Sequence, residues 1–256
     1  MSPGRLRLSL LGTFRVQGDL HEAPPAGQAQ RLLKLLAAHD GRFVPVDVLI
    51  DVLWSRPPDH AERNIAVLVS RLRRALGRER IDGGPAGYRL VLDDDTTVDL
   101  FEARDLVATA EHELTDRRFA PAADAAERAA ALFSSGRALT EERDAPWTAE
   151  VRLLAEHLLR RARRCWWTAA LELGAHGTVV EVAGAALRDD PLDEEASRAA
   201  MAAHQRAGES GRALLVYRAL RTALAEQLGA DPSPATQALF LSIPVSYTHL
   251  TLPTKA

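Results

Sequence analysis

The sequence predicts a mainly α-helical protein whose small β component is confined to the N-terminal third. Apolar residues follow a mixture of period-two and helical spacing up to about residue 98, and helical spacing alone after it. The charge changes at nearly the same place. Residues 1–92 contain 14 Lys and Arg against 9 Asp and Glu, whereas residues 93–256 contain 18 against 26. We therefore predict one domain at 1–98, an all-α domain at 99–243 and an unstructured tail at 244–256.

Residues 5–18 predict two short strands. Leu6, Leu8 and Leu10 alternate with polar residues, which is the pattern of a strand with one buried face. Gly12 interrupts the alternation and residues 14–16 resume it.

Three helices are predicted next, at 28–39, 46–54 and from 59 or 60 to 76. Each has an apolar stripe at helical spacing, and Gly41, the Pro57–Pro58 pair and Gly77 end them in turn. Residues 80–81 and 88–92 then predict two strands around a glycine-rich turn, with Arg80 and Arg89 beside it. Three helices followed by such a hairpin are typical of a winged helix-turn-helix.

Beyond residue 98 the sequence predicts helices only, at 101–115, 120–133, 147–174, 178–188, 193–207 and 210–228. Gly, Pro and Asp separate them, and small Ala residues occupy many apolar positions. Helical hairpins of this length are typical of tetratricopeptide-like arrays. A plain helical bundle fits the same pattern.

The third predicted helix has two opposite faces. Ile65, Leu68, Val69, Leu72 and Leu76 form an apolar face. The opposite face contains Arg63, Val67, Ser70, Arg71 and Arg74, with Arg73 at its margin and few acidic residues nearby. Arg side chains bind phosphate and the guanine edge, so this face favours a recognition helix for the DNA major groove. A solvated basic surface is the simpler interpretation.

The order of the two parts and several segments resemble a known family. These segments are LSLLGTFRV at 8–16, NIAVLVSRLRRALG at 64–77, GYRL at 87–90, VDLFEA at 98–103 and MAAHQRAGESGRALLVYRALRTALAEQLGADPS at 201–233. They are similar to the Streptomyces antibiotic regulatory proteins, in which an OmpR-type winged helix precedes a bacterial transcriptional activation domain. The resemblance extends over roughly residues 5–243.

This resemblance implies a transcriptional activator that binds direct repeats in double-stranded DNA near promoters of secondary-metabolite genes and recruits RNA polymerase. Self-association on the DNA is left open. The implied DNA contacts are Arg63, Asn64, Val67, Ser70, Arg71, Arg73 and Arg74 in the helix, and Tyr88 and Arg89 in the wing. The implied polymerase contacts are Trp54, Ser55, Arg56 and Asp59. The alternative is a helical-repeat scaffold whose winged helix docks protein rather than DNA.

Other functional classes have little support in the sequence. A single cysteine, Cys165, excludes an intrachain disulfide and a CxxC zinc site, and the eight His residues show no HExxH spacing. Asp93–Asp95 are expected to form a solvated turn. We therefore expect no enzyme activity, no cofactor and no metal.

The expected location is the cytoplasm, in association with the nucleoid. No apolar run is long enough to span a membrane, and the N-terminus lacks a secretory signal. We expect no receiver domain before the first strand and expect residues 1–98 to fold and bind DNA alone. The Thr-rich tail at 246–256 looks like translated sequencing adapter.

Overall fold

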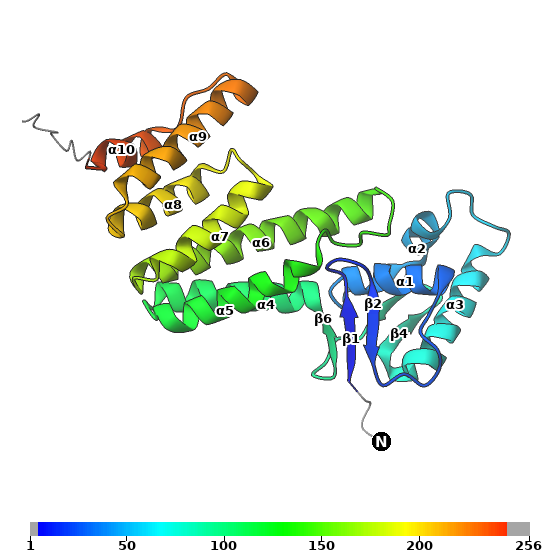
Figure 1. The fold of residues 1–256 in the computed structure, drawn as a ribbon. Helices are drawn as coiled ribbons and strands as arrows, with labels where there is room; N and C mark the ends of the chain where they lie inside the picture. The colour runs from blue at the N-terminus through cyan, green and yellow to red at the C-terminus, as the bar shows by residue number, and fades with distance from the viewer. Residues whose placement is uncertain (1–4, 245–256) are drawn as a thin grey trace, which may run out of the picture. The chain divides into compact units, whose positions relative to one another are not determined.

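The structure is a computed structural model, and it describes residues 5–244 (Figure 1). The predicted tail beyond residue 244 lies outside the described residues. The chain forms two compact units. The first contains Met1–Ala108 and Arg128–Leu159, and the second contains Thr109–Glu127 and Arg160–Ala256. The first unit thus combines the N-terminal residues with a segment from the predicted all-α part.

The N-terminal sheet has the strand order β2-β1-β6. Strand β1 (Leu6–Ser9) pairs antiparallel with β2 (Arg15–Gly18) and parallel with β6 (Thr96–Val98). Leu6, Leu8 and Leu10 are buried, which confirms the period-two interpretation. The sequence did not predict β6, a strand of only three residues whose pairing depends on a partner about 90 residues away.

Helices α1 (Gly27–Ala38), α2 (Val46–Leu53) and α3 (Ala61–Leu76) begin and end within two residues of the predicted positions. Their apolar stripes form the core of the winged helix, where Leu32, Leu36, Leu49 and Leu72 are fully buried. The chain leaves α3 at Gly77, whose φ of 108° suits glycine.

The wing is a second three-stranded sheet with the order β3-β5-β4. Strands β4 (Ile81–Gly84) and β5 (Gly87–Leu90) form the predicted hairpin, and β3 (Val44–Pro45) was not predicted. Gly87 has a structural reason to be glycine, because a Cβ there would lie 2.3 Å from the carbonyl oxygen of Val44. Arg80 is not at the wing as expected: it is buried in the short helix η1 (Arg78–Arg80), where it contacts Asp93 and Thr96.

A segment far along the chain completes the first unit. The backbone N–H of Leu139 donates to the carbonyl of Leu10 at 2.9 Å, and that of Thr140 donates to Gly12 at 3.1 Å. The ammonium of Lys34, which is only 2% exposed, lies 2.7 Å from Glu141 and 2.8 Å from Glu142. Residues 139–142 are therefore bound to the N-terminal sheet and to α1.

The remaining described elements are helical, which confirms the predicted fold class. They are α4 (Asp99–Thr115), α5 (Phe119–Leu132), η2 (Phe133–Ser135), α6 (Pro146–Glu172), α7 (His176–Asp189), α8 (Glu194–Arg206), α9 (Ser210–Leu228) and α10 (Pro234–Ser242). Successive helices form hairpins (Figure 1), and small residues such as Ala183, Ala196 and Ala199 pack around Trp167. Helix α10, which was not predicted, stacks Phe240 on Tyr217 of α9 at a centroid distance of 4.0 Å.

Candidate nucleic-acid interface

Helix α3 has the two faces that its sequence predicts. The five residues of the predicted apolar face are all buried. Arg63, Val67, Ser70, Arg71 and Arg74 are exposed on the other side, and Asn64 is half-buried near the start of the helix. The structure therefore brings together most of the predicted contact residues on one surface.

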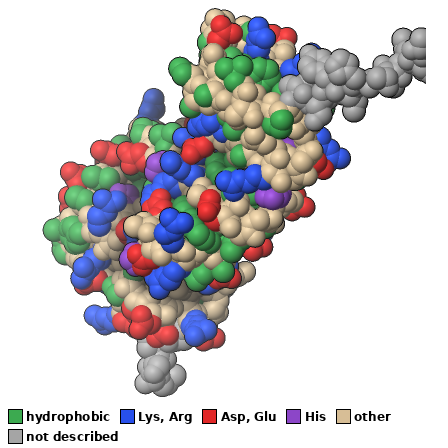
Figure 2. Space-filling view, turned by 90° about the vertical axis from the view of Figure 1, so that its left-hand side faces the viewer, with side chains coloured by type: hydrophobic (Ala, Val, Ile, Leu, Met, Phe, Trp, Pro, Cys, Tyr) green, Lys and Arg blue, Asp and Glu red, His purple; other side chains and the backbone are tan. Residues whose placement is uncertain are grey.

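Three basic side chains of this surface have no acidic partner in the described part of the chain. Within residues 5–244, Arg63, Arg71 and Arg74 make no ion pair and no side-chain hydrogen bond. By contrast, the face drawn in Figure 2 intersperses Lys and Arg with Asp and Glu. Three unpaired Arg around an exposed Val67 can bind phosphates and base edges, with Val67 suited to a thymine methyl group.

Arg73 differs from its neighbours because it bridges α3 and the wing. Its Nε donates to the carbonyl of Ile81 and its Nη2 to that of Gly83, both at 3.0 Å. Its guanidinium also lies 5.8 Å from the centre of the Tyr88 ring. Arg73 was predicted as a direct DNA contact; in this structure its Nε and Nη2 bind the hairpin, and the DNA contact stays a prediction.

The two predicted wing residues are in different environments. Tyr88 is only 5% exposed, so its ring packs beneath Arg73 instead of facing solvent as a direct contact requires. Arg89 is exposed and pairs with Asp82, whose carboxylate oxygen lies 2.7 Å from Nη2. This hydrogen bond from Arg89 lowers the pKa of Asp82 below its ordinary value. Asp82 binds Nε and Nη2 of Arg89, and neither contact involves Nη1.

The loop between α2 and α3 is exposed along almost its whole length. Ser55, Arg56 and Asp59 are exposed, and Trp54 is half-buried at the end of α2. No ion pair or side-chain hydrogen bond of Arg56 or Asp59 occurs among the described residues. The predicted polymerase contacts therefore form an accessible surface that is continuous in sequence with the start of α3.

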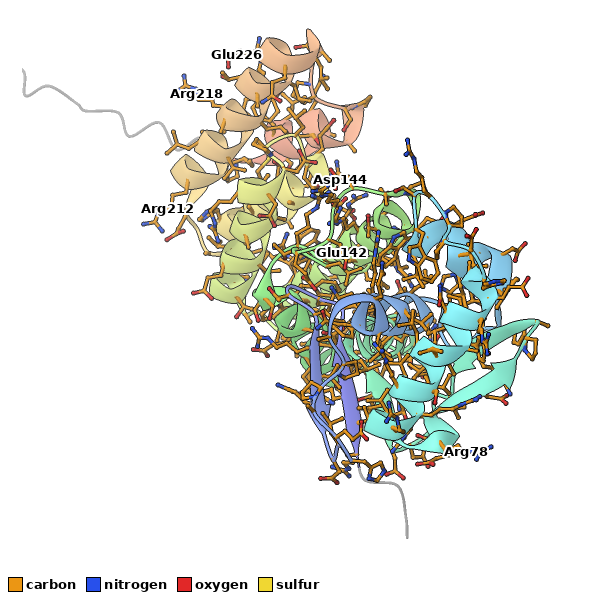
Figure 3. All side chains as sticks on the ribbon, turned by 90° about the vertical axis from the view of Figure 1, so that its right-hand side faces the viewer. Arg78, Glu142, Asp144, Arg212, Arg218 and Glu226 are labelled. Atoms are coloured by element: carbon orange, nitrogen blue, oxygen red, sulfur yellow. The ribbon has the colours of Figure 1, made fainter. Side chains whose placement is uncertain are left out.

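Two further residues near this surface were not predicted. Arg78 in η1 is exposed just beyond α3 and points outward (Figure 3). Phe43 is 49% exposed and its ring lies next to Gly87 of the wing. An isolated basic or aromatic residue in a loop gives no periodic signal, so the helical pattern could not identify either one.

The described residues contain little that suggests other chemistry. Between residues 5 and 244, no three His, Cys, Asp or Glu side chains are grouped as a metal site would need. Cys165 is buried, and burial raises the pKa of its thiol to about 11, which disfavours the reactive thiolate. None of the helices in this part of the chain is long and apolar enough to cross a bilayer.

Comparison with known families matches both parts of the chain. Residues 98–243 match the bacterial transcriptional activator domain, and residues 24–90 match the C-terminal domain of transcriptional regulatory proteins.

Several characterised regulators are similar over most of this chain. The regulatory protein AfsR of Streptomyces coelicolor is 31% identical over 238 residues, which cover 92% of this chain and 24% of AfsR. The transcriptional regulatory protein EmbR of Mycobacterium tuberculosis is 30% identical over 251 residues, 92% of this chain and 62% of EmbR. The regulatory protein DnrI of Streptomyces peucetius is 29% identical over 237 residues, 84% of this chain and 83% of DnrI.

A solved structure has a similar fold. It is Mycobacterium tuberculosis EmbR in complex with a low-affinity phosphopeptide, which superposes with a TM-score of 0.83 at 28% identity. The match covers 94% of this chain and 66% of the EmbR chain. The chain thus spans about a quarter of the length of AfsR and about two thirds of that of EmbR.

Proposed function

Because the chain belongs to the Streptomyces antibiotic regulatory protein family and carries its bacterial transcriptional activator domain, we propose that it activates transcription by binding DNA through α3 and the wing. The observation that supports this most strongly is the basic face of α3, where Arg63, Arg71 and Arg74 have no ion pair within residues 5–244. An α-helix fits the major groove, and Arg can donate two hydrogen bonds to guanine or to a phosphate. A face meant only for solvent would be expected to mix acidic with basic residues.

The residues of this face have different proposed roles. Arg71 and Arg74, in the C-terminal half of α3, read base edges or hold phosphates, and Val67 contacts a thymine methyl group. Arg63, Asn64 and Ser70 contact the DNA backbone or adjacent bases. Arg73 positions the wing, so that Nη1 of Arg89 reaches a neighbouring phosphate.

Single substitutions in α3 test the interface. Arg71→Ala and Arg74→Ala should each weaken binding to the target site by about 1–3 kcal/mol if the side chain reads a base. A phosphate contact would instead weaken binding to all sequences alike. Neither change should lower the melting temperature, because both side chains are exposed.

Arg218→Ala provides a control with the same change in charge. Arg218 is exposed on α9 and points outward (Figure 3), so its loss should leave DNA affinity unchanged. Equal loss of affinity in all three variants would indicate a general charge effect. Unchanged affinity in the two α3 variants would favour the scaffold function.

The proposed target sites are direct repeats near promoters, in a gene cluster for a secondary metabolite. A protein that binds each repeat in the same orientation places neighbouring copies side by side, which allows self-association on the DNA. Immunoprecipitation of the protein with its DNA from cells, followed by sequencing, tests this. Enrichment of promoter-proximal sequences that contain a repeated motif supports the proposal, and no enrichment contradicts it.

The proposed activating surface is the loop that contains Trp54, Ser55, Arg56 and Asp59, which would contact RNA polymerase. Pro57 and Pro58 restrict the backbone of this loop, so little conformational entropy is lost when a partner binds. This function places the protein in the cytoplasm on the nucleoid, and it requires no cofactor.

A further inference from the structure

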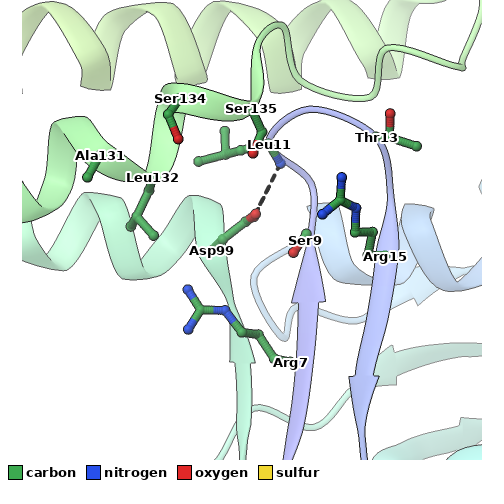
Figure 4. A pocket seen from close by; sticks show the side chains of 10 residues that line it. All are labelled: Arg7, Ser9, Leu11, Thr13, Arg15, Asp99, Ala131, Leu132, Ser134 and Ser135. Carbon is green, nitrogen blue, oxygen red and sulfur yellow. Dashed lines mark hydrogen bonds between the residues drawn. The ribbon is translucent and has the colours of Figure 1, made fainter.

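A small polar pocket lies in the first unit, away from the residues of the basic face of α3. Its walls are β1, β2, the loop between them, the start of α4, the end of α5 and the short helix η2 (Figure 4), and its volume is about 170 Å³. This volume is sufficient for a small ion or a single functional group, and it is too small for a nucleotide or a drug-sized ligand.

The walls of the pocket are held in place by backbone contacts. Gly12 has a φ of 78°, and a Cβ at this position would lie 2.6 Å from the Cβ of Ser135, so the loop presses directly against η2. The hydrogen bonds from Leu139 to Leu10 and from Thr140 to Gly12 attach the residues that follow η2 to the same loop. The pocket is therefore formed in the folded unit before any ligand binds.

Several hydrogen-bond donors of the pocket are exposed and have no partner among residues 5–244. The guanidinium of Arg15 makes no ion pair or hydrogen bond with residues 5–244. The same holds within these residues for four hydroxyl groups that line the pocket, those of Ser9, Thr13, Ser134 and Ser135. A second Arg, Arg7, also lines it and lies 2.9 Å from Glu102.

The one acidic group in the lining is already satisfied. Asp99 is 5% exposed, and its carboxylate accepts a hydrogen bond from the backbone N–H of Leu10 at 2.7 Å. It accepts a second from the backbone N–H of Leu11 at 3.3 Å (Figure 4). The guanidinium of Arg15 and the four hydroxyl groups of the lining are therefore available to bind a ligand. Because Arg7 is shared with Glu102, Arg15 must provide most of the attraction for a ligand.

We propose that this pocket binds a phosphate group, either as inorganic phosphate or as the phosphate of a small phosphomonoester. A tetrahedral oxyanion can accept hydrogen bonds in several directions at once, and the guanidinium of Arg matches its geometry. Arg15 comes from the N-terminal sheet, whereas Ser134 and Ser135 come from a segment about 120 residues later. Bound phosphate therefore links these two segments and stabilises the first unit.

A phosphate titration of the full chain, followed by the amide resonances in NMR spectra, tests this proposal. Chloride at equal ionic strength serves as the reference. Phosphate should shift the amide resonances of Ser134, Ser135 and Gly12 in a saturable way. Arg15→Gln should weaken this binding about tenfold or more, the effect of losing one charge-assisted hydrogen bond.

Arg71→Gln is the matched control, because the basic face of α3 also attracts phosphate. This variant should lose any shifts in α3 and keep those of the pocket. Spectra of both variants in chloride should match that of the wild type outside the substituted residue, which verifies folding. A phosphomonoester that binds more tightly than inorganic phosphate identifies a metabolite as the ligand, and equal affinity identifies inorganic phosphate.

The proposal is overturned if the pocket resonances respond neither to inorganic phosphate nor to the phosphomonoester. It is also overturned if Arg15→Gln leaves the affinity for phosphate unchanged. Shifts that are confined to α3 also overturn it, because they assign the phosphate to the DNA-binding surface alone.

Discussion

Lys34 allows the attachment of residues 139–142 to α1 to be tested quantitatively. Its ammonium lies within 2.8 Å of both Glu141 and Glu142 and 5.4 Å from the centre of the Phe14 ring. Lys34→Met keeps most of the aliphatic side chain and removes the charge. The two carboxylates then lose their shared partner in a poorly solvated place.

The expected loss of stability can be estimated from the environment of each carboxylate. Removing one partner of a buried ion pair costs about 3–5 kcal/mol. Glu141 is one third exposed, and Glu142 keeps Arg31 at 3.6 Å, so we expect about 2–4 kcal/mol here. For a cooperative unit of this size, that corresponds to a decrease of roughly 5–15 °C in melting temperature.

The triple variant Lys34→Met, Glu141→Gln, Glu142→Gln separates charge from packing. It removes the uncompensated carboxylates and should recover much of the lost stability in thermal unfolding followed by circular dichroism. A triple variant as unstable as Lys34→Met would attribute the loss to packing. If the free energy of unfolding of Lys34→Met at neutral pH lies within about 0.5 kcal/mol of that of the wild type, the ion cluster is refuted as the main attachment of residues 139–142.

The same cluster predicts a dependence on pH. Burial raises the pKa of Glu141, but the hydrogen bond from Lys34 and other favourable contacts outweigh it, so the pKa lies below its ordinary value. A carboxyl group with a lowered folded-state pKa stabilises the fold above its unfolded pKa, about 4.3, and this stabilisation is lost as the pH falls through the folded pKa. The difference in free energy of unfolding between the wild type and Lys34→Met should therefore become smaller below about pH 4.

Three other predictions address the interface. Arg73→Ala should weaken DNA binding and also lower the melting temperature, unlike Arg71→Ala, because Arg73 holds the wing through Ile81 and Gly83; an unchanged melting temperature would contradict this positioning role. Arg56→Ala combined with Asp59→Ala should keep DNA affinity within about twofold, roughly 0.4 kcal/mol, and sharply reduce transcription with purified polymerase; full transcription would make the loop a connector. A fragment of residues 1–98 should bind DNA but melt at a lower temperature than a fragment of residues 1–159, because it lacks Asp99 and residues 139–142, which bind Leu10, Gly12 and Lys34. Equal melting temperatures would show that these contacts do not stabilise the domain.

The sequence was sufficient to predict features that depend on local periodicity. The faces of α3 follow from residues three and four positions apart, and the alternation of Leu6, Leu8 and Leu10 defines the buried side of β1. Helix ends were accurate because Gly and Pro act within one turn of the backbone.

Features that depend on distant partners could not be predicted in this way. The two residues of β3 form a strand only because Gly87 and Tyr88 pair with them. Lys34 lies in a stripe of Leu residues, and its partners are more than 100 positions away. The contacts of Arg73 with the wing were not predicted, because a helical wheel gives the direction of a side chain and not what the wing places beside it.

The most direct test of the account is the salt dependence of DNA affinity for the wild type and for the variant Arg63→Ala, Arg71→Ala, Arg74→Ala. Each phosphate contact contributes about 0.9 to the slope of log affinity against log salt, because bound phosphates release counterions. We predict a steep slope for the wild type, and for the variant a slope lower by about 1 for each of these Arg residues that holds a phosphate. Identical slopes and affinities for the two proteins would contradict the assignment of α3 as the DNA-binding surface.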